Sequence, residues 1–366
     1  MFYRKQARPV FVHSLIVLLL WGCGQAPELG TVATLDQAPG NITVTPDKRI
    51  IFSLHQFFSP DWRVAEWTDQ GIKPFPNADI ASSNDADISL HSVLGIQSDS
   101  KGIVWMLDNG MRGNATAKLV AWDTQHNKLH KTIMLPKPIT PDDAFVNDLA
   151  VDDTHNSIYI SDPAGGDNAA LIVVDVGSGD ARRVLQGHAS VVPEDMDLII
   201  AGEAVEIRQA DGSVVRPRVG ANPIALDTAN EWLYYGPMHG GSLYRIRVND
   251  LLNREIDAEA LAAKVERYGR KPISDGISID RKGTVYITDL ANNAIGVIDQ
   301  SREYRIYLTD ERLSWPDALS FGLDERLYTV SNQLHRSAPL NAGELTAKPP
   351  FYIFSLTALA DGVSGR

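Results

Sequence analysis

Short alternations of apolar and polar residues run through most of the chain. Ile277 and Ile279 alternate with small or polar neighbours, and Leu149 and Val151 do the same. A period of two is typical of a strand that rests one face on a core. A polar turn and a second apolar stretch follow each alternation, so the pattern predicts a series of hairpins.

The hairpin unit repeats along the chain. The five clearest first strands occupy residues 94–99, 147–152, 222–227, 275–280 and 317–322, and a weaker copy at 41–45 precedes them. Third strands are expected at 119–122, 171–174, 242–245 and 294–297, and fourth strands at 131–134, 181–184 and 305–307. Four strands per unit make a propeller blade. We therefore predict an all-β fold, a six-bladed β-propeller with four-stranded blades, with a pair of β-sandwiches or a seven-bladed closure as alternatives.

Two segments depart from the repeat. The long stretch between Asp175 and Gly220 contains the apolar residues of 203–208 and 214–217, which predict one inserted hairpin. Residues 248–267 carry apolar side chains at helical spacing and predict one helix on the outside of the disc.

The N-terminus has the features of a targeting segment. Arg4, Lys5 and Arg8 precede the apolar residues 10–20, which are too few to span a membrane as a helix. The tetrapeptide Leu20-Trp21-Gly22-Cys23 resembles a bacterial lipobox, and Cys23 is the single cysteine of the chain. We predict a lipoprotein signal peptide over residues 1–22, a lipidated Cys23 with a tether to residue 38, and one propeller domain over 39–360. An ordinary signal peptide and an uncleaved anchor are the alternatives.

Charge and composition exclude several functions. The chain has 34 Lys and Arg against 46 Asp and Glu, a formal net charge of −12, which argues against a nucleic-acid partner. Removal of residues 1–22 takes away three positive charges and leaves −15. One cysteine excludes an internal disulfide, a multi-cysteine zinc site and an iron–sulfur cluster. The chain contains no nucleophile elbow, phosphate loop or dinucleotide fingerprint.

One position of the repeat gathers polar side chains. The residue before each alternating first strand is Asn or Asp in four of the six units, which read Gly40, Leu94, Asn147, Asn222, Asp275 and Asp317. First strands line the channel of a propeller, so these matched positions are expected at equal depth around it. Converging oxygens suit a hard cation such as calcium or the ammonium group of an organic ligand. A purely structural role is the alternative, because Asn and Asp also bond their own backbone in turns.

Four other residues are weaker candidates. Gln97 lies three residues into the second unit's first strand and is expected to reach the channel. His239 is a candidate acid or base. Asn332 and Leu334 follow the last unit's second strand and are candidates for ligand contact. Packing is the alternative for each.

Several of these segments resemble the major royal jelly protein/yellow family. The motifs that carry the resemblance are residues 92–97 with 104–108, residues 160–162, residues 274–277 with 288–289, and Trp315-Pro-Asp317 with Ser331-Asn-Gln-Leu-His335. The resemblance implies a secreted six-bladed propeller that binds amines in its channel or carries out dopachrome-type conversion. The resemblance implies a ligand pocket formed by Asn332, Leu334 and the strand-entry residues Asn147, Asn222, Asp275 and Asp317. Gln97 joins these expected ligand-binding residues because of its place in the strand.

Bacterial members are also similar to gluconolactonase-like propellers, which hold a divalent cation with one Glu, two Asn and one Asp. Asn147, Asn222 and Asp275 match the two Asn and the Asp, whereas the Glu has no counterpart. Calcium is therefore the cofactor this relative implies, and Asn147, Asn222 and Asp275 are its implied ligands.

These observations lead to one functional hypothesis, with two enzyme mechanisms to consider, and to a rival interpretation as a protein-interaction platform. We expect a lipid-anchored propeller in a bacterial cell envelope, on the outer membrane facing the periplasm or secreted, that binds an amine, a catechol or a sugar lactone. As a lactone hydrolase it would polarise the carbonyl with calcium while Asp275 or Asp317 takes a proton from water. As a tautomerase it would move a proton with an Asp or His239. A protein-interaction platform for basic partners is the other alternative.

Overall fold

The computed structural model describes Met1 and residues 27–82, 88–111, 114–323 and 325–366. Cys23 and almost all of the predicted signal segment lie outside the described residues. Within the described part of the chain, no helix has the length and apolar character needed to cross a membrane.

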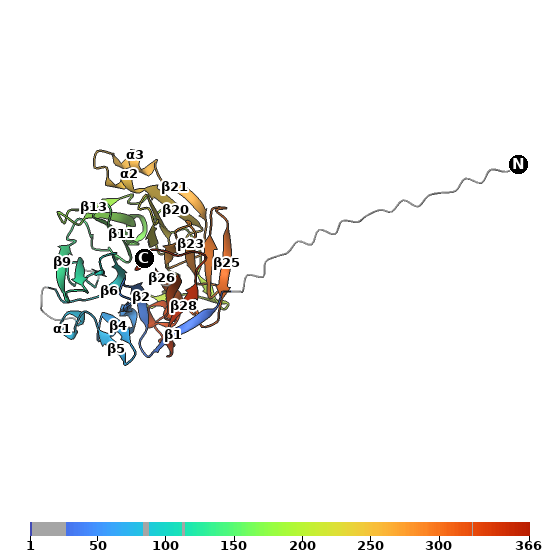
Figure 1. Ribbon diagram of the computed structural model, residues 1–366, viewed down its shortest axis with the longest axis horizontal. Helices are drawn as coiled ribbons and strands as arrows, with labels where there is room; N and C mark the ends of the chain where they lie inside the picture. The colour runs from blue at the N-terminus through green and yellow to red at the C-terminus, as the bar shows by residue number, and fades with distance from the viewer. Residues whose placement is uncertain (2–26, 83–87, 112–113, 324) are drawn as a thin grey trace.

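Six four-stranded antiparallel sheets form the blades of a propeller, as predicted (Figure 1). The first two blades are β2 (Pro39–Val44), β3 (Ile50–Leu54), β4 (Val64–Thr68) and β5 (Gly71–Pro74), then β6 (Val93–Ser98), β7 (Ile103–Asp108), β8 (Lys118–Asp123) and β9 (Lys128–Met134). The third and fourth are β10 (Leu149–Asp152), β11 (Ser157–Asp162), β12 (Ala170–Asp175) and β13 (Ala181–Val184), then β18 (Ala221–Leu226), β19 (Trp232–Pro237), β20 (Ser242–Arg247) and β21 (Glu266–Arg270). The fifth is β22 (Ile277–Ile279), β23 (Val285–Asp289), β24 (Ala294–Ile298) and β25 (Tyr304–Thr309).

The sixth blade joins the two ends of the chain. It consists of β26 (Pro316–Phe321), β27 (Arg326–Ser331), β28 (Phe351–Thr357) and, outermost, β1 (Leu29–Leu35). Leu29 pairs with Leu356 and Leu35 with Phe351, so β1 lies beside β28 in Figure 1. The predicted tether over 23–38 is therefore wrong for Leu29–Leu35. An irregular register between Thr31 and Ala33 breaks the alternation that would have marked this strand.

The first strand of every blade faces the axis, and these strands contact one another in a closed ring. Close approach between them requires glycine at two places. A Cβ atom on Gly95 would lie 2.6 Å from the carbonyl oxygen of Asn147, and one on Gly276 would collide with the backbone of Asp317. Apolar clusters fill the spaces between neighbouring blades, for example the one around Tyr159, Tyr235 and Leu251.

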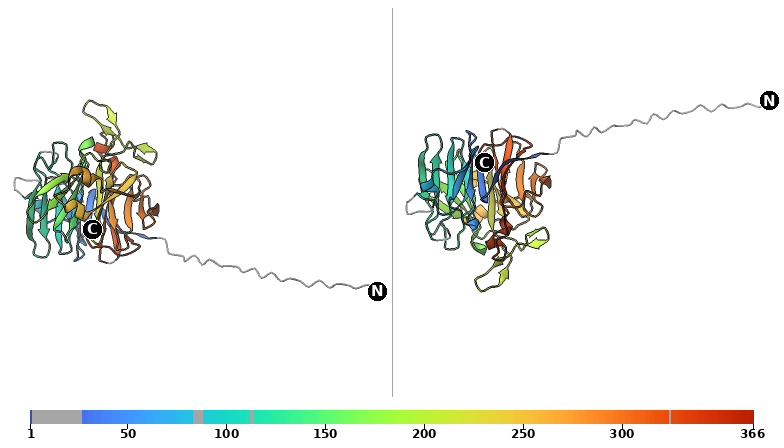
Figure 2. Two further views of the ribbon diagram at one scale, coloured as in Figure 1. Left: turned by 90° about the horizontal axis from the view of Figure 1, so that it is seen from above. Right: turned by 90° about the horizontal axis from the view of Figure 1, so that it is seen from below.

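The insertion before the fourth blade forms two small hairpins instead of the single predicted one. β14 (Ile199–Ile200) pairs with β15 (Glu203–Ala204), and β16 (Ile207–Arg208) pairs with β17 (Val214–Val215). Both hairpins project from one face of the disc (Figure 2). Backbone hydrogen bonds from Glu206 to Leu340 and from Ala342 to Glu206 attach them to the loop after β27.

The predicted helix over 248–267 is also wrong in extent. The structure has α2 (Val248–Leu252) and α3 (Ala258–Ala262), separated by a turn in which Asp257 caps α3 by accepting from the backbone of Ala260 at 2.8 Å. Residues 266–270 are β21, because the fourth blade takes its outer strand from them. The remaining short elements are α1 (Ala78–Ala81), η1 (Gln56–Phe58), η2 (Gly166–Asn168), η3 (Leu334–Arg336) and η4 (Ala338–Leu340).

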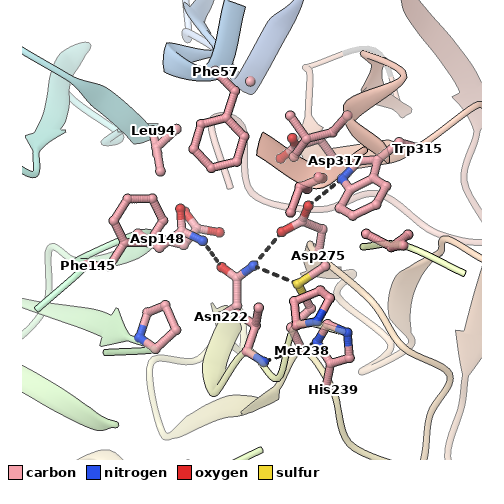
Figure 3. Close-up of a pocket in the computed structure, with 18 of the residues that line it drawn as sticks. Phe57, Leu94, Phe145, Asp148, Asn222, Met238, His239, Asp275, Trp315 and Asp317 are labelled. Carbon is pink, nitrogen blue, oxygen red and sulfur yellow. Dashed lines mark hydrogen bonds between the residues drawn. The ribbon is translucent and has the colours of Figure 1, made fainter. Parts of the chain in front are cut away.

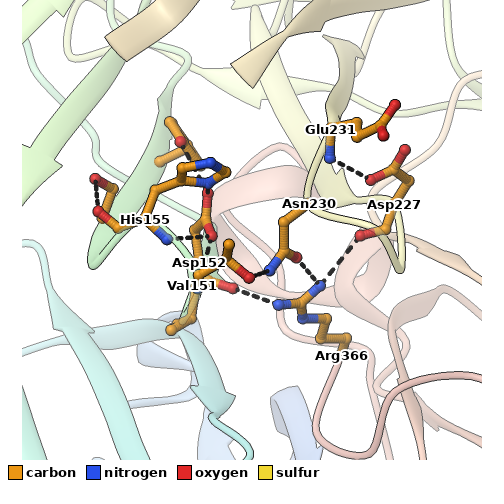
Figure 4. A network of polar contacts seen from close by, with 10 residues as sticks. Val151, Asp152, His155, Asp227, Asn230, Glu231 and Arg366 are labelled. Atoms are coloured by element: carbon orange, nitrogen blue, oxygen red, sulfur yellow. Dashed lines mark hydrogen bonds and ion pairs between the residues drawn. The ribbon is translucent and has the colours of Figure 1, made fainter. Parts of the chain in front are cut away.

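The last residues of the chain occupy the channel on the face away from the hairpins (Figures 1 and 2). Arg366 donates to the carbonyl oxygen of Val151 at 3.1 Å and to Asn230 Oδ1 at 2.6 Å (Figure 4). The propeller thus extends beyond the predicted boundary at residue 360, and this end of the channel is closed by protein.

Candidate functional site

The six matched positions at the starts of the first strands all line one cavity. Gly40, Leu94, Asn147, Asn222, Asp275 and Asp317 surround a space of about 240 Å³ on the hairpin side of the channel. Side chains from the second strands hold these positions in place. Ser53 Oγ donates to the carbonyl oxygen of Leu94, and Ser161 Oγ donates to that of Asn222, each at 2.8 Å across a blade boundary.

A chain of hydrogen bonds links three of these residues (Figure 3). Asn147 Nδ2 donates to Asn222 Oδ1, and Asn222 Nδ2 donates to Asp275 Oδ1. Trp315 Nε1 donates to the second oxygen, Asp275 Oδ2, at 2.7 Å. Asp275 is only 8 % exposed, and burial raises its pKa to about 6 despite these bonds.

Asp317 has a different set of partners. Its Oδ2 accepts from Asn332 Nδ2 at 2.6 Å, and the same amide nitrogen reaches the carbonyl oxygen of Pro39. Asn332 is fully buried behind the cavity wall, so the structure places it as a support for Asp317 and not on the cavity surface. Burial and the nearby carboxyl group of Asp275 raise the pKa of Asp317 well above its usual value.

Asp148 is a third carboxyl group on the cavity wall, and sequence reasoning missed it. Its Oδ1 accepts from Asn41 Nδ2 at 3.0 Å. Burial, reinforced by Asp275, raises the pKa of Asp148 to about 7. Asp148 and Asp317 are partly exposed, and both line the cavity. Three carboxyl groups therefore share one small space, and each makes ionisation of the others harder.

Apolar and aromatic side chains cover the rest of the wall. Phe57, Phe145 and Trp315 surround the polar chain in Figure 3. The inserted hairpins contribute Leu198, Val205 and Ile207 as a roof, and η3 and η4 contribute Leu334 and Leu340. The structure thus places the predicted Leu334 on the cavity surface.

His239 also lines the cavity, with 1 % of its surface exposed. Its Nδ1 accepts from the backbone of Val219 at 3.2 Å, which leaves the proton on Nε2. Nε2 has no hydrogen-bond partner among the described residues. Burial lowers the pKa of His239 to about 4, so the ring is neutral near pH 7 and offers a donor rather than a base.

Gln97, like Asn332, does not line this cavity. Its Oε1 accepts from the backbone of Val151 at 2.5 Å. It lies with Arg366 at the closed end of the channel, where it links the second and third blades.

Three side-chain oxygens of the implied metal ligands already accept hydrogen bonds. Asn222 Oδ1 accepts from Asn147, and both oxygens of Asp275 accept N–H groups. A calcium ion needs six to eight oxygens directed at one point. Within the described ranges no group of three or more His, Cys, Asp or Glu residues is arranged to hold a metal ion. In this arrangement the three implied ligands bond one another rather than a common centre, and calcium binding stays a prediction.

Sequence comparison identifies the family. The profile described as "Major royal jelly protein" matches residues 91–343, which is more than half of the chain. The chain belongs to the major royal jelly protein family. This confirms the resemblance carried by the motifs around Gln97, Asp275 and Trp315. No curated protein matches the chain in sequence.

Solved structures share the fold of this family member at low identity. A gluconolactonase from Xanthomonas campestris is 12% identical with a TM-score of 0.57, and the alignment covers 90% of this chain and 89% of that one. A putative gluconolactonase is 14% identical with a TM-score of 0.53, covering 92% and 94% of the two chains. A luciferin-regenerating enzyme is 12% identical with a TM-score of 0.54, covering 93% and 98%.

Proposed function

We propose that this royal jelly family member binds a small organic amine in its channel cavity. The observation that supports the proposal is the placement of Asp148, Asp275 and Asp317 around one space of about 240 Å³. Three carboxyl groups held away from bulk water need a cation to ionise together. An ammonium group would supply that positive charge and would donate up to three hydrogen bonds.

The protein's own cations do not fill this role. Arg218 is the one Arg or Lys among the residues that line the cavity, and it pairs with Asp195 at 2.7 Å and with Asp197 at 2.8 Å. Lys271 lies behind the wall and donates to the carbonyl oxygens of Met238, Gly240 and Pro272. The positive charge is therefore left to the ligand.

The walls also favour a ligand with an apolar or aromatic body. Phe57, Phe145 and Trp315 offer ring surfaces beside the carboxyl groups. Aromatic rings attract cations as well as apolar groups. A sugar lactone, which is neutral and strongly hydroxylated, could donate hydroxyl groups to these carboxyl groups but would bring no positive charge to balance them.

Isothermal titration calorimetry tests the proposal. We expect the protein to bind 2-phenylethylamine and to ignore its neutral analogue ethylbenzene. A titration with calcium chloride on chelator-treated protein is run beside it. Saturable calcium binding without amine binding would overturn the proposal and favour the metal-dependent lactonase instead.

We further propose that Cys23 carries a lipid anchor. The lipobox-like residues before it support this, and β1 begins only six residues later, at Leu29. Six residues span at most about 20 Å, so the propeller would lie close to the membrane surface. In a bacterial host, Cys23→Ser is expected to move the protein out of the membrane pellet. A variant that stays in the pellet would contradict the anchor.

A further inference from the structure

A second cavity lies next to the first. It has a volume of about 610 Å³ and shares four wall residues with the channel cavity, which are Phe57, Phe145, Ile207 and Leu340. These four apolar side chains lie at the boundary between the two spaces, which we call the neck. A ligand longer than the inner cavity would pass through the neck and place its far end in the outer cavity.

The two cavities carry opposite charges. The inner wall contains three Asp side chains, whereas the outer wall contains Arg63, His91 and Arg208 and no Asp or Glu. The contrast is notable in a chain with a formal net charge of −12. Random placement of acidic residues would favour Asp and Glu in the outer wall as well.

The two arginines are held by neutral groups. Arg63 Nε donates to the carbonyl oxygen of His91 at 2.6 Å, and its Nη1 donates to that of Pro60. Arg208 Nε donates to the carbonyl oxygen of Ala342 at 2.7 Å. Neither guanidinium forms a salt bridge within the described residues, in contrast to Arg218.

The buried acidic group whose charge acts most on Arg63, Asp108, has other partners. Asp108 and Asp61 are the carboxyl groups whose charges act on Arg63. Asp108 is fully buried, accepts from the backbone of His91 and Ser92, and lies 3.6 Å from Lys118 Nζ. Its charge is thus already compensated from the protein side.

We infer that the ligand is dipolar, with an ammonium group at the inner carboxyl cluster and a carboxylate at Arg63 and Arg208 in the outer cavity. The inference rests on the proposed amine function and adds the second charge of the substrate class. Arginine recognises a carboxylate with paired N–H donors. The apolar neck would hold the ring or alkyl segment that joins the two charged ends.

Three probes separate the two charges in calorimetry. 4-(2-Aminoethyl)benzoate carries both charges at opposite ends of a ring, 2-phenylethylamine carries only the ammonium, and 4-ethylbenzoate carries only the carboxylate. We expect the dipolar probe to bind at least about 10-fold more tightly than 2-phenylethylamine, as one charge-assisted arginine contact provides.

Two variants test whether Arg63 and Arg208 cause the tighter binding of the dipolar probe. Arg63→Gln and Arg208→Gln should each remove most of the preference for the dipolar probe and leave the affinity for 2-phenylethylamine within about twofold. Arg208 is exposed on the short strand β16, so this variant tests the inference even where Arg63→Gln disturbs folding. Arg305→Gln, at an exposed position on the outer strand β25, is the matched control and should change nothing.

The outcomes separate the two proposals. Equal binding of the dipolar probe and 2-phenylethylamine would overturn the dipolar ligand while the amine function stands. A preference that persists in both Arg63→Gln and Arg208→Gln would overturn the outer site. Binding of 4-ethylbenzoate as tightly as the dipolar probe, or of no probe at all, would overturn the amine function itself and this inference with it.

Discussion

Most first strands of the propeller have a polar residue at one or both of their ends, and the two ends behave differently. At the end away from the cavity, Asp99, Asp152, Asp227 and Asp280 bond the turn that follows them. Asp280 Oδ1, for example, accepts from the backbone of Lys282 and Thr284, each at 2.9 Å. At the cavity end the side-chain partners come from other strands or other blades, as Asp275 shows with Asn222 and Trp315.

The difference teaches how to read a repeated polar residue. Both positions recur at a fixed place in the repeat, so recurrence alone does not separate a structural role from a binding role. The partners do separate them. A carboxyl group satisfied by its own turn stabilises a hairpin, whereas carboxyl groups gathered from several blades into one cavity are left to share a ligand.

The largest expected effect is at the turn end. Asp152 accepts from the backbone of Thr154 and His155 and from the hydroxyl of the buried Tyr159 at 3.1 Å. Asp152→Ala leaves these donors unpaired and should lower the free energy of unfolding by about 2–4 kcal/mol in urea denaturation. Amine affinity should stay within about twofold. Unchanged stability would contradict the structural role of Asp152. Loss of amine binding in a folded variant would contradict the assignment of binding to the cavity end alone.

The next effect is at the cavity end and affects affinity. Asp317→Asn keeps an acceptor for Asn332 Nδ2 but removes a charge from the cavity. We expect 2-phenylethylamine to bind about 10- to 100-fold more weakly, with stability equal to or above that of the unmodified protein. Asp227→Asn, at a turn end, is the matched control and should keep its amine affinity. Equal losses in the two variants would contradict the assignment.

The smallest effect, counted per pH unit, is a dependence of stability on pH. The pKa of Asp148 is raised to about 7 in the folded protein, so the folded state keeps a proton that the unfolded chain releases near its ordinary pKa of about 4. The stabilisation is therefore complete below about pH 4 and is lost as the pH rises through 7, by at most about 1.4 kcal/mol per pH unit.

Urea denaturation of the unmodified protein and of Asp148→Asn between pH 4.5 and 8 measures the contribution of Asp148 to stability. It is the difference between the free energies of unfolding of the two proteins. The subtraction matters because the pKa of His239, lowered to about 4, gives a contribution of opposite sign. Parallel curves for the two proteins would mean that Asp148 does not titrate in this range. Amine affinity should change in the opposite direction and increase with pH, because the carboxyl groups ionise.

Much of the fold followed from local pattern. Alternation in the first strands, such as Ile277 and Ile279, repeats at similar spacing, and this determined the number of blades. The repeat also allowed residues as distant as Asn147 and Asp317 to be compared at one offset, and the structure places both on the same cavity. Neither inference needed a long-range contact to be known in advance.

The missed residues depend on irregular backbone. Pairing is irregular at the start of several first strands, for example between Val93 and Ile96 and between Ala221 and Ile224. In the third blade pairing with β11 begins only at Leu149, so Asn147 and Asp148 both line the cavity although strict alternation would turn one of them away. Trp315 bonds Asp275 from a left-handed backbone conformation, with its own φ at 59°. No periodic pattern in the sequence indicates such a conformation.

The closure of the ring by β1 has a consequence for how the protein is made. Leu29–Leu35 leaves the ribosome near the beginning of synthesis, yet its partner Phe351–Thr357 is among the last segments to appear. Until then β28 is missing from the sixth blade. The backbone groups of β1 therefore stay unpaired and can pair with another chain. The ring therefore closes only after translation of all six blades. A chain that ends before residue 351 would expose the strand edges of β1 and β27 that β28 normally covers.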